Sequence, residues 1–391
     1  MRRLGPLVLA AGLSAPLALA QAQAPGPYRR DVAQPLEFRG PGRDEPAPDV
    51  AEVVFGWFGP DDPDHPDFGE FWRGAVLALE AENAAGGYRG APFRLVAAWS
   101  EDPWRGGIGR LTRLVYEARP WAVIGGVDGA TTHLAEQVAL KARFALLSPG
   151  STDPSANCGH VPWLFTCLPS DERLARVLVA RLATELRGGT LAVAASADHD
   201  SHATLIALRR ELARLGLQAQ TLVEFDAAEP DARPLVARLV EARPSAVVVV
   251  APSRPAAAVV SELRRRGFPG AVLGGAPLAR SAFARAAGPA ADGVLAPLLY
   301  EASPAWDAFT RAYEDRWRVM PDDAAAQGYD AVRFLASAVR TSGLNRARIA
   351  DALRALAPWN GAAGVLRWDA LGRNQRAVGL AAWRGGRRVP L

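Results

Sequence analysis

The stretch Val53–Phe58, Val-Val-Phe-Gly-Trp-Phe, is a continuous apolar run with the length of a buried β-strand. Residues 71–85 follow with the apolar spacing of a helix and end at two glycines, a typical helix stop. The alternation continues with strands at 94–99, 121–126 and 145–148 and helices at 105–119 and 131–142. Short apolar strands that alternate with helices indicate a parallel sheet covered by helices.

The alternation starts again after Pro169. Ser170 is placed to cap a helix, and the acids Asp171 and Glu172 are favourable near its positive N-terminus. Further strands are expected at 191–196, 220–225, 246–250 and 271–273, and helices at 203–215, 232–242 and 256–266. Three successive helices, at 304–317, 324–341 and 346–356, then precede two short strands at 365–368 and 378–383. We therefore predict an α/β fold with two open parallel-sheet units.

The N-terminus has the features of an export signal. Two arginines precede an apolar run at residues 4–20, which ends in an Ala-Leu-Ala triplet. A charged start, a short apolar segment and an Ala-x-Ala end are typical of a secretory signal peptide. We predict a signal peptide over residues 1–20, cleaved after Ala20 with Ala22 or Ala24 as alternative sites, and hence a periplasmic protein.

Length and composition suit two globular lobes. The chain has 391 residues, of which 49% are hydrophobic and 22% are charged. Residues 21–50 are rich in proline and are expected to form an extended or disordered lead-in. The net charge is only +4, and arginines and acids are interspersed rather than grouped, so no nucleic-acid partner is predicted.

Enzyme signatures are missing from the sequence. The glycine-rich stretch 106–109 does not follow a strand and lacks the dinucleotide fingerprint, and neither a Walker loop nor a Gly-x-Ser-x-Gly elbow is present. His199 and His202 are three residues apart, but no third metal ligand is evident, so we interpret them as exposed loop histidines. We predict no catalytic residues, no cofactor and no metal site.

The chain contains two cysteines, Cys158 and Cys167. In an oxidising compartment they are placed to close a small loop, so we predict a disulfide between them. Two free thiols are the alternative.

Two loops after predicted strands are rich in glycine, serine and threonine. They cover residues 125–132 and 148–152, each before a helix or turn. Backbone N–H groups at such positions bind anionic groups such as a carboxylate, at the edge where open α/β sheets hold ligands. Ordinary turn chemistry is the alternative interpretation.

Several segments, in one consistent order, resemble the type I periplasmic binding proteins, in particular the leucine/isoleucine/valine-binding branch. They are residues 58–60, 68–70, 73–75, 83–87, 122–125, 147–154, 165, 169–171 and 328–331. The resemblance implies two Rossmann-like lobes joined by a three-stranded hinge, with the ligand between them. Lobe 1 would be residues 51–168 plus 300–363, and lobe 2 residues 169–299 plus 364–391. The crossings would fall near 168–169, 297–300 and 361–366.

The resemblance also implies a ligand-binding wall in lobe 1. In relatives, the segment aligned with Gly150, Ser151 and Thr152 contacts the α-carboxylate and ammonium of the ligand, and the aromatic aligned with Phe68 lines the pocket. Gly129 stands where relatives commonly have a serine. The residues beside it, also expected in the pocket, are Ala130 and Thr131.

Lobe 2 departs from the family pattern. Ala276 replaces the acid expected to pair with a ligand ammonium, and Asp200 replaces a tyrosine, with His199 beside it. Ser253 and Arg254 fall where another pocket aromatic is expected. Because a buried ammonium without a counter-charge costs several kcal/mol, we predict a small organic acid, amide or aromatic ligand. Arg254 or His199 would hold a second acidic group.

The function that follows is that of an exported binding protein. We predict the solute-binding component of an ABC transporter of the branched-chain amino acid type, a monomer with a small-molecule ligand and a membrane permease as partner. It would perform no catalysis. The alternative is a ligand-sensing module that reports to a membrane signalling protein, because a shared fold does not fix the function.

Overall fold

The computed structural model describes residues 28–29, 37–186, 188–228 and 231–391. The predicted signal peptide at 1–20 lies outside the described residues, as does most of the lead-in. The described part of the lead-in forms a two-stranded antiparallel ribbon of β1 (Tyr28–Arg29) and β2 (Glu37–Phe38). Residues 42–45 then dock on lobe 1, where the side-chain amide of Asn345 donates to three of their carbonyl groups.

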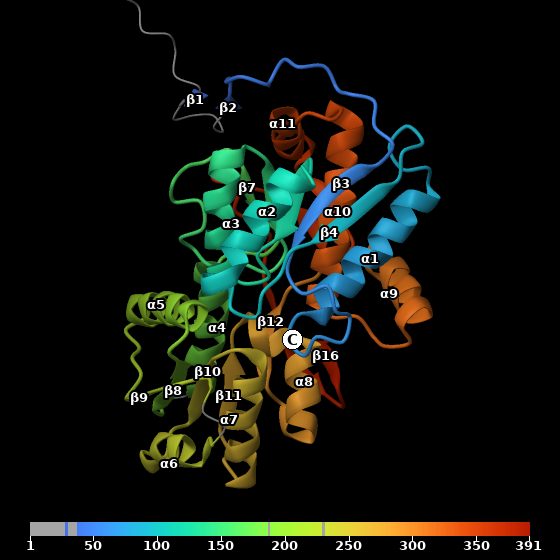
Figure 1. Ribbon diagram of the computed structural model, residues 1–391. Helices are drawn as coiled ribbons and strands as arrows, with labels where there is room; N and C mark the ends of the chain where they lie inside the picture. The colour runs from blue at the N-terminus through green and yellow to red at the C-terminus, as the bar shows by residue number, and fades with distance from the viewer. Residues whose placement is uncertain (1–27, 30–36, 187, 229–230) are drawn as a thin grey trace, which may run out of the picture.

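Lobe 1 is built on a five-stranded parallel sheet with the strand order β4-β3-β5-β6-β7. Its strands are β3 (Val53–Phe58), β4 (Phe93–Ala97), β5 (Ala122–Gly125), β6 (Ala145–Ser148) and β7 (Leu164–Thr166). Its helices are α1 (Gly69–Ala84), the short π-helix η1 (Pro103–Gly107), α2 (Ile108–Glu117) and α3 (Gly129–Ala142). Three later helices complete this lobe (Figure 1), namely α9 (Pro304–Trp317), α10 (Asp323–Ser342) and α11 (Arg346–Leu356).

Lobe 2 is built on a seven-stranded sheet with the order β16-β15-β12-β11-β10-β8-β9. Its parallel strands are β8 (Leu191–Ser196), β9 (Thr221–Phe225), β10 (Ala246–Val250), β11 (Ala271–Gly274) and β12 (Leu295–Leu298). The last two strands, β15 (Gly379–Arg384) and β16 (Arg387–Pro390), add an antiparallel edge. The helices are α4 (Asp171–Leu186), α5 (His199–Arg214), α6 (Arg233–Glu241), α7 (Ser253–Arg265), α8 (Ser281–Ala287) and the short η2 (Ala276–Ala279) and η3 (Gly288–Ala291).

Three chain crossings join the lobes. Cys167 belongs to the core of lobe 1 and Leu168 to that of lobe 2, so the first crossing lies between these two residues. The second follows β12, where Leu299 belongs to the core of lobe 2 and Tyr300 packs against a lobe 1 cluster. The third is displaced: β13 (Trp359–Gly361) and β14 (Gly364–Leu366) form a hairpin that stays with lobe 1, and lobe 2 resumes only near Val378. The predicted crossing at 361–366 is therefore wrong, because Leu366 is buried in the core of lobe 1.

The predicted disulfide is not formed. Cys158 and Cys167 are both free, and Cys158 is exposed whereas Cys167 is fully buried. The backbone N–H of Cys167 donates to the carbonyl of Ser148, which holds its strand end inside the lobe while Cys158 sits in a surface turn. Burial raises the pKa of the Cys167 thiol well above its usual value. None of the described helices is long and apolar enough to cross a bilayer.

Candidate functional site

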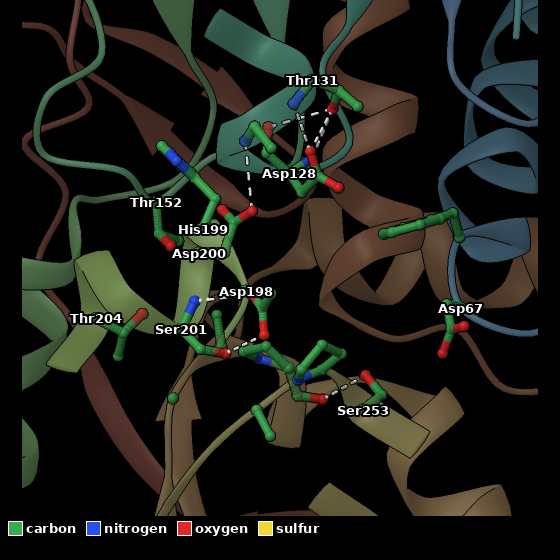
Figure 2. Close-up of a pocket in the computed structure, with 18 of the residues that line it drawn as sticks. Asp67, Asp128, Thr131, Thr152, Asp198, His199, Asp200, Ser201, Thr204 and Ser253 are labelled. Carbon is green, nitrogen blue, oxygen red and sulfur yellow. Dashed lines mark hydrogen bonds between the residues drawn. The ribbon is translucent and has the colours of Figure 1, made fainter. Parts of the chain in front are cut away.

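A cavity of about 520 Å³ lies between the two lobes. Its walls come from the carboxyl ends of parallel strands in both lobes, which is where open α/β sheets bind ligands. Figure 2 shows Thr152 and Thr131 of lobe 1 on one side and the first turn of α5 of lobe 2 facing them. The lining residues are Asp67, Phe68, Pro103, Trp104, Asp128, Ala130, Thr131, Gly150, Thr152, Asp198, His199, Asp200, Ser201, Thr204, Val250, Ala251, Pro252, Ser253, Gly275, Ala276, Pro277 and Arg280.

A carboxylate of lobe 2 occupies the N-terminus of α3 in lobe 1. The backbone N–H groups of Gly129 and Ala130 donate to the two oxygens of Asp200, at 2.6 and 3.3 Å. Free N–H groups at a helix start, together with the helix dipole, favour an anion at this position. Asp200 therefore fills an anion-binding position with the protein's own carboxylate and links the lobes across the cavity.

Gly129 makes room for this contact. A Cβ atom at position 129 would lie 2.4 Å from Oδ1 of Asp200, so any side chain there would displace the carboxylate. Glycine is also required at position 150 in the neighbouring loop. A Cβ atom there would lie 2.1 Å from the carbonyl oxygen of Val127, so only glycine allows the two loops to approach this closely. Burial, and next the charge of Asp128, raise the pKa of Asp200 to about 7.

The helix starts explain why Asp200 can reach the cavity. α5 begins at His199, four residues earlier than predicted, because Asp198 caps it by accepting from the backbone N–H of Ser201 at 3.0 Å. The segment 198–202, expected to be an exposed loop, is therefore the cap and first turn of a helix. Asp128 caps α3 in the same way, accepting from the N–H of Thr131 at 2.8 Å.

A second buried carboxyl joins the two walls. Asp171, at the start of α4, accepts a hydrogen bond from the Thr204 hydroxyl at 2.9 Å, and its N–H donates to the carbonyl of Thr152 at 2.7 Å. Thr152 lines the cavity from lobe 1 and Thr204 from lobe 2. Burial raises the pKa of Asp171 to about 8, so this carboxyl is largely protonated at neutral pH.

Arg280 is one of the cavity residues that sequence reasoning missed. Its guanidinium carbon lies 5.6 Å from the ring centre of Phe68 and 5.1 Å from that of Phe71. Within the described part of the chain its guanidinium forms no ion pair and no hydrogen bond. Burial lowers the pKa of Arg280. The negative charges of several acids, Asp322 foremost, oppose this shift, although none of these acids forms an ion pair with Arg280. An arginine in this state is available to an anionic group of a ligand.

The predicted site residues divide into two groups. The structure brings most of them to the cavity: Phe68, Ala130, Thr131, Gly150, Thr152, His199, Asp200, Ser253 and Ala276. Three are outside its lining. The backbone N–H of Gly129 donates to Asp200 and is not free for a ligand. The hydroxyl of Ser151 is buried and accepts from the N–H of Asp153 at 3.3 Å. Arg254 is exposed in the first turn of α7.

The predicted role of Arg254 does not fit its position. Arg254 follows Ser253, whose hydroxyl faces the cavity side and donates to the carbonyl of Pro277 at 2.9 Å. The adjacent residue on a helix points elsewhere. The signal for Arg280 was its position a few residues after β11, in the loop where Ala276 was already predicted to lie in the pocket.

A model of the family described as periplasmic binding protein matches residues 53–387. The chain belongs to this family. The chain is 27% identical to an amino acid binding protein of Pseudomonas aeruginosa over 331 residues, an alignment that covers 83% of this chain and 87% of the relative. The predicted family and the predicted α/β fold with parallel-sheet lobes are thus confirmed.

Solved structures with this fold include proteins named for different ligands. The branched-chain amino acid transporter substrate binding protein LivJ of Streptococcus pneumoniae, in complex with isoleucine, superposes with a TM-score of 0.78 at 21% identity, over 87% of this chain and 99% of that chain. A solute-binding protein of R. palustris in complex with benzoate gives 0.77 at 18% identity, over 87% and 95%. The chain shares the fold of these structures.

Proposed function

We propose that this protein is the solute-binding component of an ABC transporter. It captures a small organic acid with an apolar or aromatic body between its lobes and delivers it to a membrane permease. Membership of the periplasmic binding protein family supports the role and the periplasmic location. Export through a signal peptide cleaved after Ala20, and action as a monomer, are part of the proposal.

The observation that carries the ligand class is Arg280. It is a cavity-lining cation that no carboxylate of the described residues pairs with, although acids surround the cavity. A ligand carboxylate would pair with the Arg280 guanidinium through two charge-assisted hydrogen bonds. Such a hydrogen bond contributes about 1.5–3 kcal/mol, or a factor of roughly 10–150 in affinity.

The remaining walls favour an apolar body. Phe68 stands beside Arg280, and Val250 and Pro277 also line the cavity. Trp104, on the short helix η1, lines the cavity yet keeps 60% of its surface exposed. Its aromatic ring is therefore available to pack against a bound ligand. A flat or aliphatic acid gains burial of apolar surface from these side chains.

A free α-amino acid is disfavoured in this pocket. In relatives named for amino acids, the resemblance implies that the ligand carboxylate uses the loop around Gly129. Here Asp200 already accepts from the N–H groups of Gly129 and Ala130, so a ligand carboxylate would have to displace it. Ala276 also offers no counter-charge for an ammonium.

The proposal is tested by measuring ligand binding to the wild type and to variants of Arg280 and Arg254, by thermal shift and by calorimetry. A ligand that binds only the folded protein raises the melting temperature by mass action. We expect benzoate or another small carboxylic acid to stabilise the wild type, and Arg280→Gln to weaken that binding at least tenfold. Arg254→Gln is the matched control and should bind normally, because Arg254 lies outside the cavity. Tight leucine binding that survives Arg280→Gln would contradict the proposal.

A further inference from the structure

Two imidazoles from different lobes meet one buried carboxylate beside the cavity. His133 lies on α3 of lobe 1 and His199 begins α5 of lobe 2. Their Nε2 atoms lie 3.0 and 2.8 Å from the same oxygen, Oδ2 of Asp153. One ligand atom from each residue falls within 4.8 Å of the other two. Two imidazoles and a carboxylate that converge in this way form the donor set of many transition-metal sites.

The surroundings orient these donors. The other oxygen of Asp153, Oδ1, accepts from both the N–H and the hydroxyl of Ser155, at 2.7 Å each, which leaves Oδ2 aimed at the imidazoles. Nδ1 of His133 lies 3.6 Å from a carboxylate oxygen of Glu136. A carboxylate behind the second nitrogen of a histidine fixes the ring so that the first nitrogen can bind a metal.

The spacing fits a tetrahedral ion after a small adjustment. Zinc binds histidine nitrogen and carboxylate oxygen at about 2.0–2.2 Å, which separates neighbouring tetrahedral ligands by roughly 3.3 Å. The present N–O separations are therefore only a few tenths of an ångström too short. The side chain of Asp153 is almost fully buried, whereas that of His199 is 40% exposed and lies at the cavity wall. A fourth coordination position would open toward solvent and the cavity.

We propose that His133, Asp153 and His199 form a Zn²⁺ site that bridges the two lobes. The sequence spacing of His199 and His202 suggested no metal because the other ligands come from residues far away in the chain. Lobe 1 supplies two of the ligands and lobe 2 the third, so the complete site exists only when the lobes are together. Zinc binding then stabilises the present arrangement of the two lobes, in addition to the contact of Asp200 with α3. The site adjoins the solute cavity, which His199 also lines, but its three donors come together without a solute.

The test is calorimetric titration of the mature, chelator-treated protein with Zn²⁺ as the only probe. We expect one saturable site per chain. His199→Ala should weaken binding at least tenfold, and so should Asp153→Asn. His202→Ala is the matched control: it removes an exposed histidine from the same helical turn and should leave the affinity unchanged. Because His199 is partly exposed, its variant is expected to fold, and its melting curve without metal checks this.

Two further measurements separate the site from adventitious binding. Cys158→Ser removes the exposed thiol and should not alter zinc affinity. Co²⁺ should give the visible absorption of a four-coordinate ion in the wild type and lose it in His199→Ala. The proposal is overturned if zinc does not saturate at one equivalent, or if His199→Ala and His202→Ala bind it equally. No solute is present, so either result leaves the proposed transport role untouched.

Discussion

At the scale of single residues, positions 129 and 200 form a matched pair. Gly129 lacks the side chain that would collide with Oδ1 of Asp200, and Asp200 accepts the N–H group that Gly129 leaves open. The sequence showed both departures from the family pattern but not their contact, because they are 71 positions apart and in different lobes. Together they turn an anion-binding helix start into a link between the lobes.

Replacing Asp200 by alanine should therefore open the position to a ligand carboxylate. We expect Asp200→Ala to gain affinity for L-leucine of at least tenfold over the wild type, since two backbone N–H groups at the positive end of α3 become available. Calorimetry with leucine measures the change. Asp226→Ala, at an exposed position of lobe 2, is the control. Equal leucine affinity in Asp200→Ala and the wild type would show that Asp200 does not block this position.

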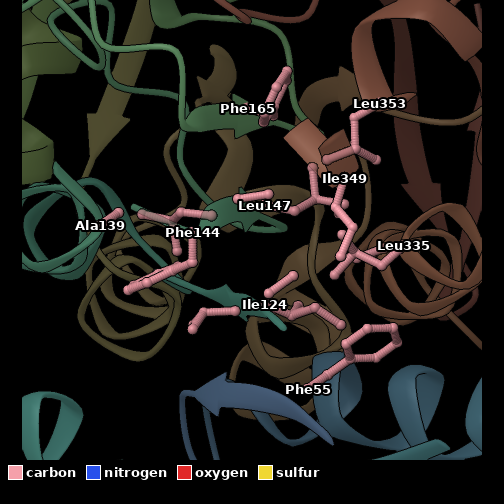
Figure 3. Close-up of a cluster of buried hydrophobic side chains, with 14 of the residues drawn as sticks. Phe55, Ile124, Ala139, Phe144, Leu147, Phe165, Leu335, Ile349 and Leu353 are labelled. Atoms are coloured by element: carbon pink, nitrogen blue, oxygen red, sulfur yellow. The ribbon is translucent and has the colours of Figure 1, made fainter. Parts of the chain in front are cut away.

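At the scale of elements, α10 is the central support of lobe 1. Figure 3 shows Leu335 of α10 and Ile349 of α11 packed toward Ile124 of β5, and all three are fully buried. On another side α10 touches α1 at backbone distance. A Cβ on Gly328 would lie 2.1 Å from the carbonyl oxygen of Phe71, so only glycine permits this approach. Helices that pack this closely need small residues at the contact.

Gly328→Ala should separate the two helices at a cost. Overpacking of a dense contact typically destabilises a protein by about 1–3 kcal/mol, and the added methyl group here meets rigid backbone. The control is Gly109→Ala in α2, where a Cβ meets nothing within 4 Å; alanine there is expected to be neutral or to stabilise by up to about 1 kcal/mol. Urea unfolding of the two variants measures the difference. A neutral Gly328→Ala would contradict the packing argument.

The elements themselves were largely predictable, and the side chains that face the cavity were not. Apolar periodicity located the strands and helices of both lobes because burial dictates that pattern. The start of α5 was missed because its cap, Asp198, sits in a polar stretch that resembles a loop. Choosing between Arg254 and Arg280 depends on which way a short helix turns after its strand. Packing between elements sets this direction, and the apolar periodicity of the sequence carries no information about it.

At the scale of the whole molecule, a buried polar network joins the three crossings. The side-chain amide of Asn374 donates to the carbonyl of Cys167 at 2.6 Å, which ties the third crossing to the first. Arg376 donates to the carbonyl of Ala363 at 2.7 Å and to that of Leu299. The bond to Leu299 ties the third crossing to the second crossing. Asn374 is fully buried and Arg376 is 4% exposed. The sequence placed the third crossing too early because these partners are distant in the chain.

Buried carboxyl groups next to this hinge and the cavity make the stability of the molecule depend on pH. Burial raises the pKa of Asp330 to about 6, although it accepts from the N–H groups of Ala362 and Ala363, at 2.7 and 2.9 Å. Asp323 is raised to about 6 and Asp171 to about 8, in both cases chiefly by burial. In the unfolded chain an aspartate titrates near 3.9. The folded protein therefore binds these protons more tightly than the unfolded chain.

The stability that these groups contribute is fully present below about pH 4 and is lost as the pH rises through their folded-state pKa values. We expect the melting temperature to fall by several degrees between pH 5 and pH 8, with Asp171 contributing to the decline across this whole range and Asp323 and Asp330 only in its lower part. Asp171→Asn imitates the protonated carboxyl, since its amide oxygen still accepts from Thr204. It should make the decline shallower across the whole range, with the largest proportional effect above pH 6, where Asp323 and Asp330 no longer contribute. Melting curves of both proteins in chelator-containing buffers across this range measure the difference, and parallel curves would show that Asp171 is not protonated in the folded protein.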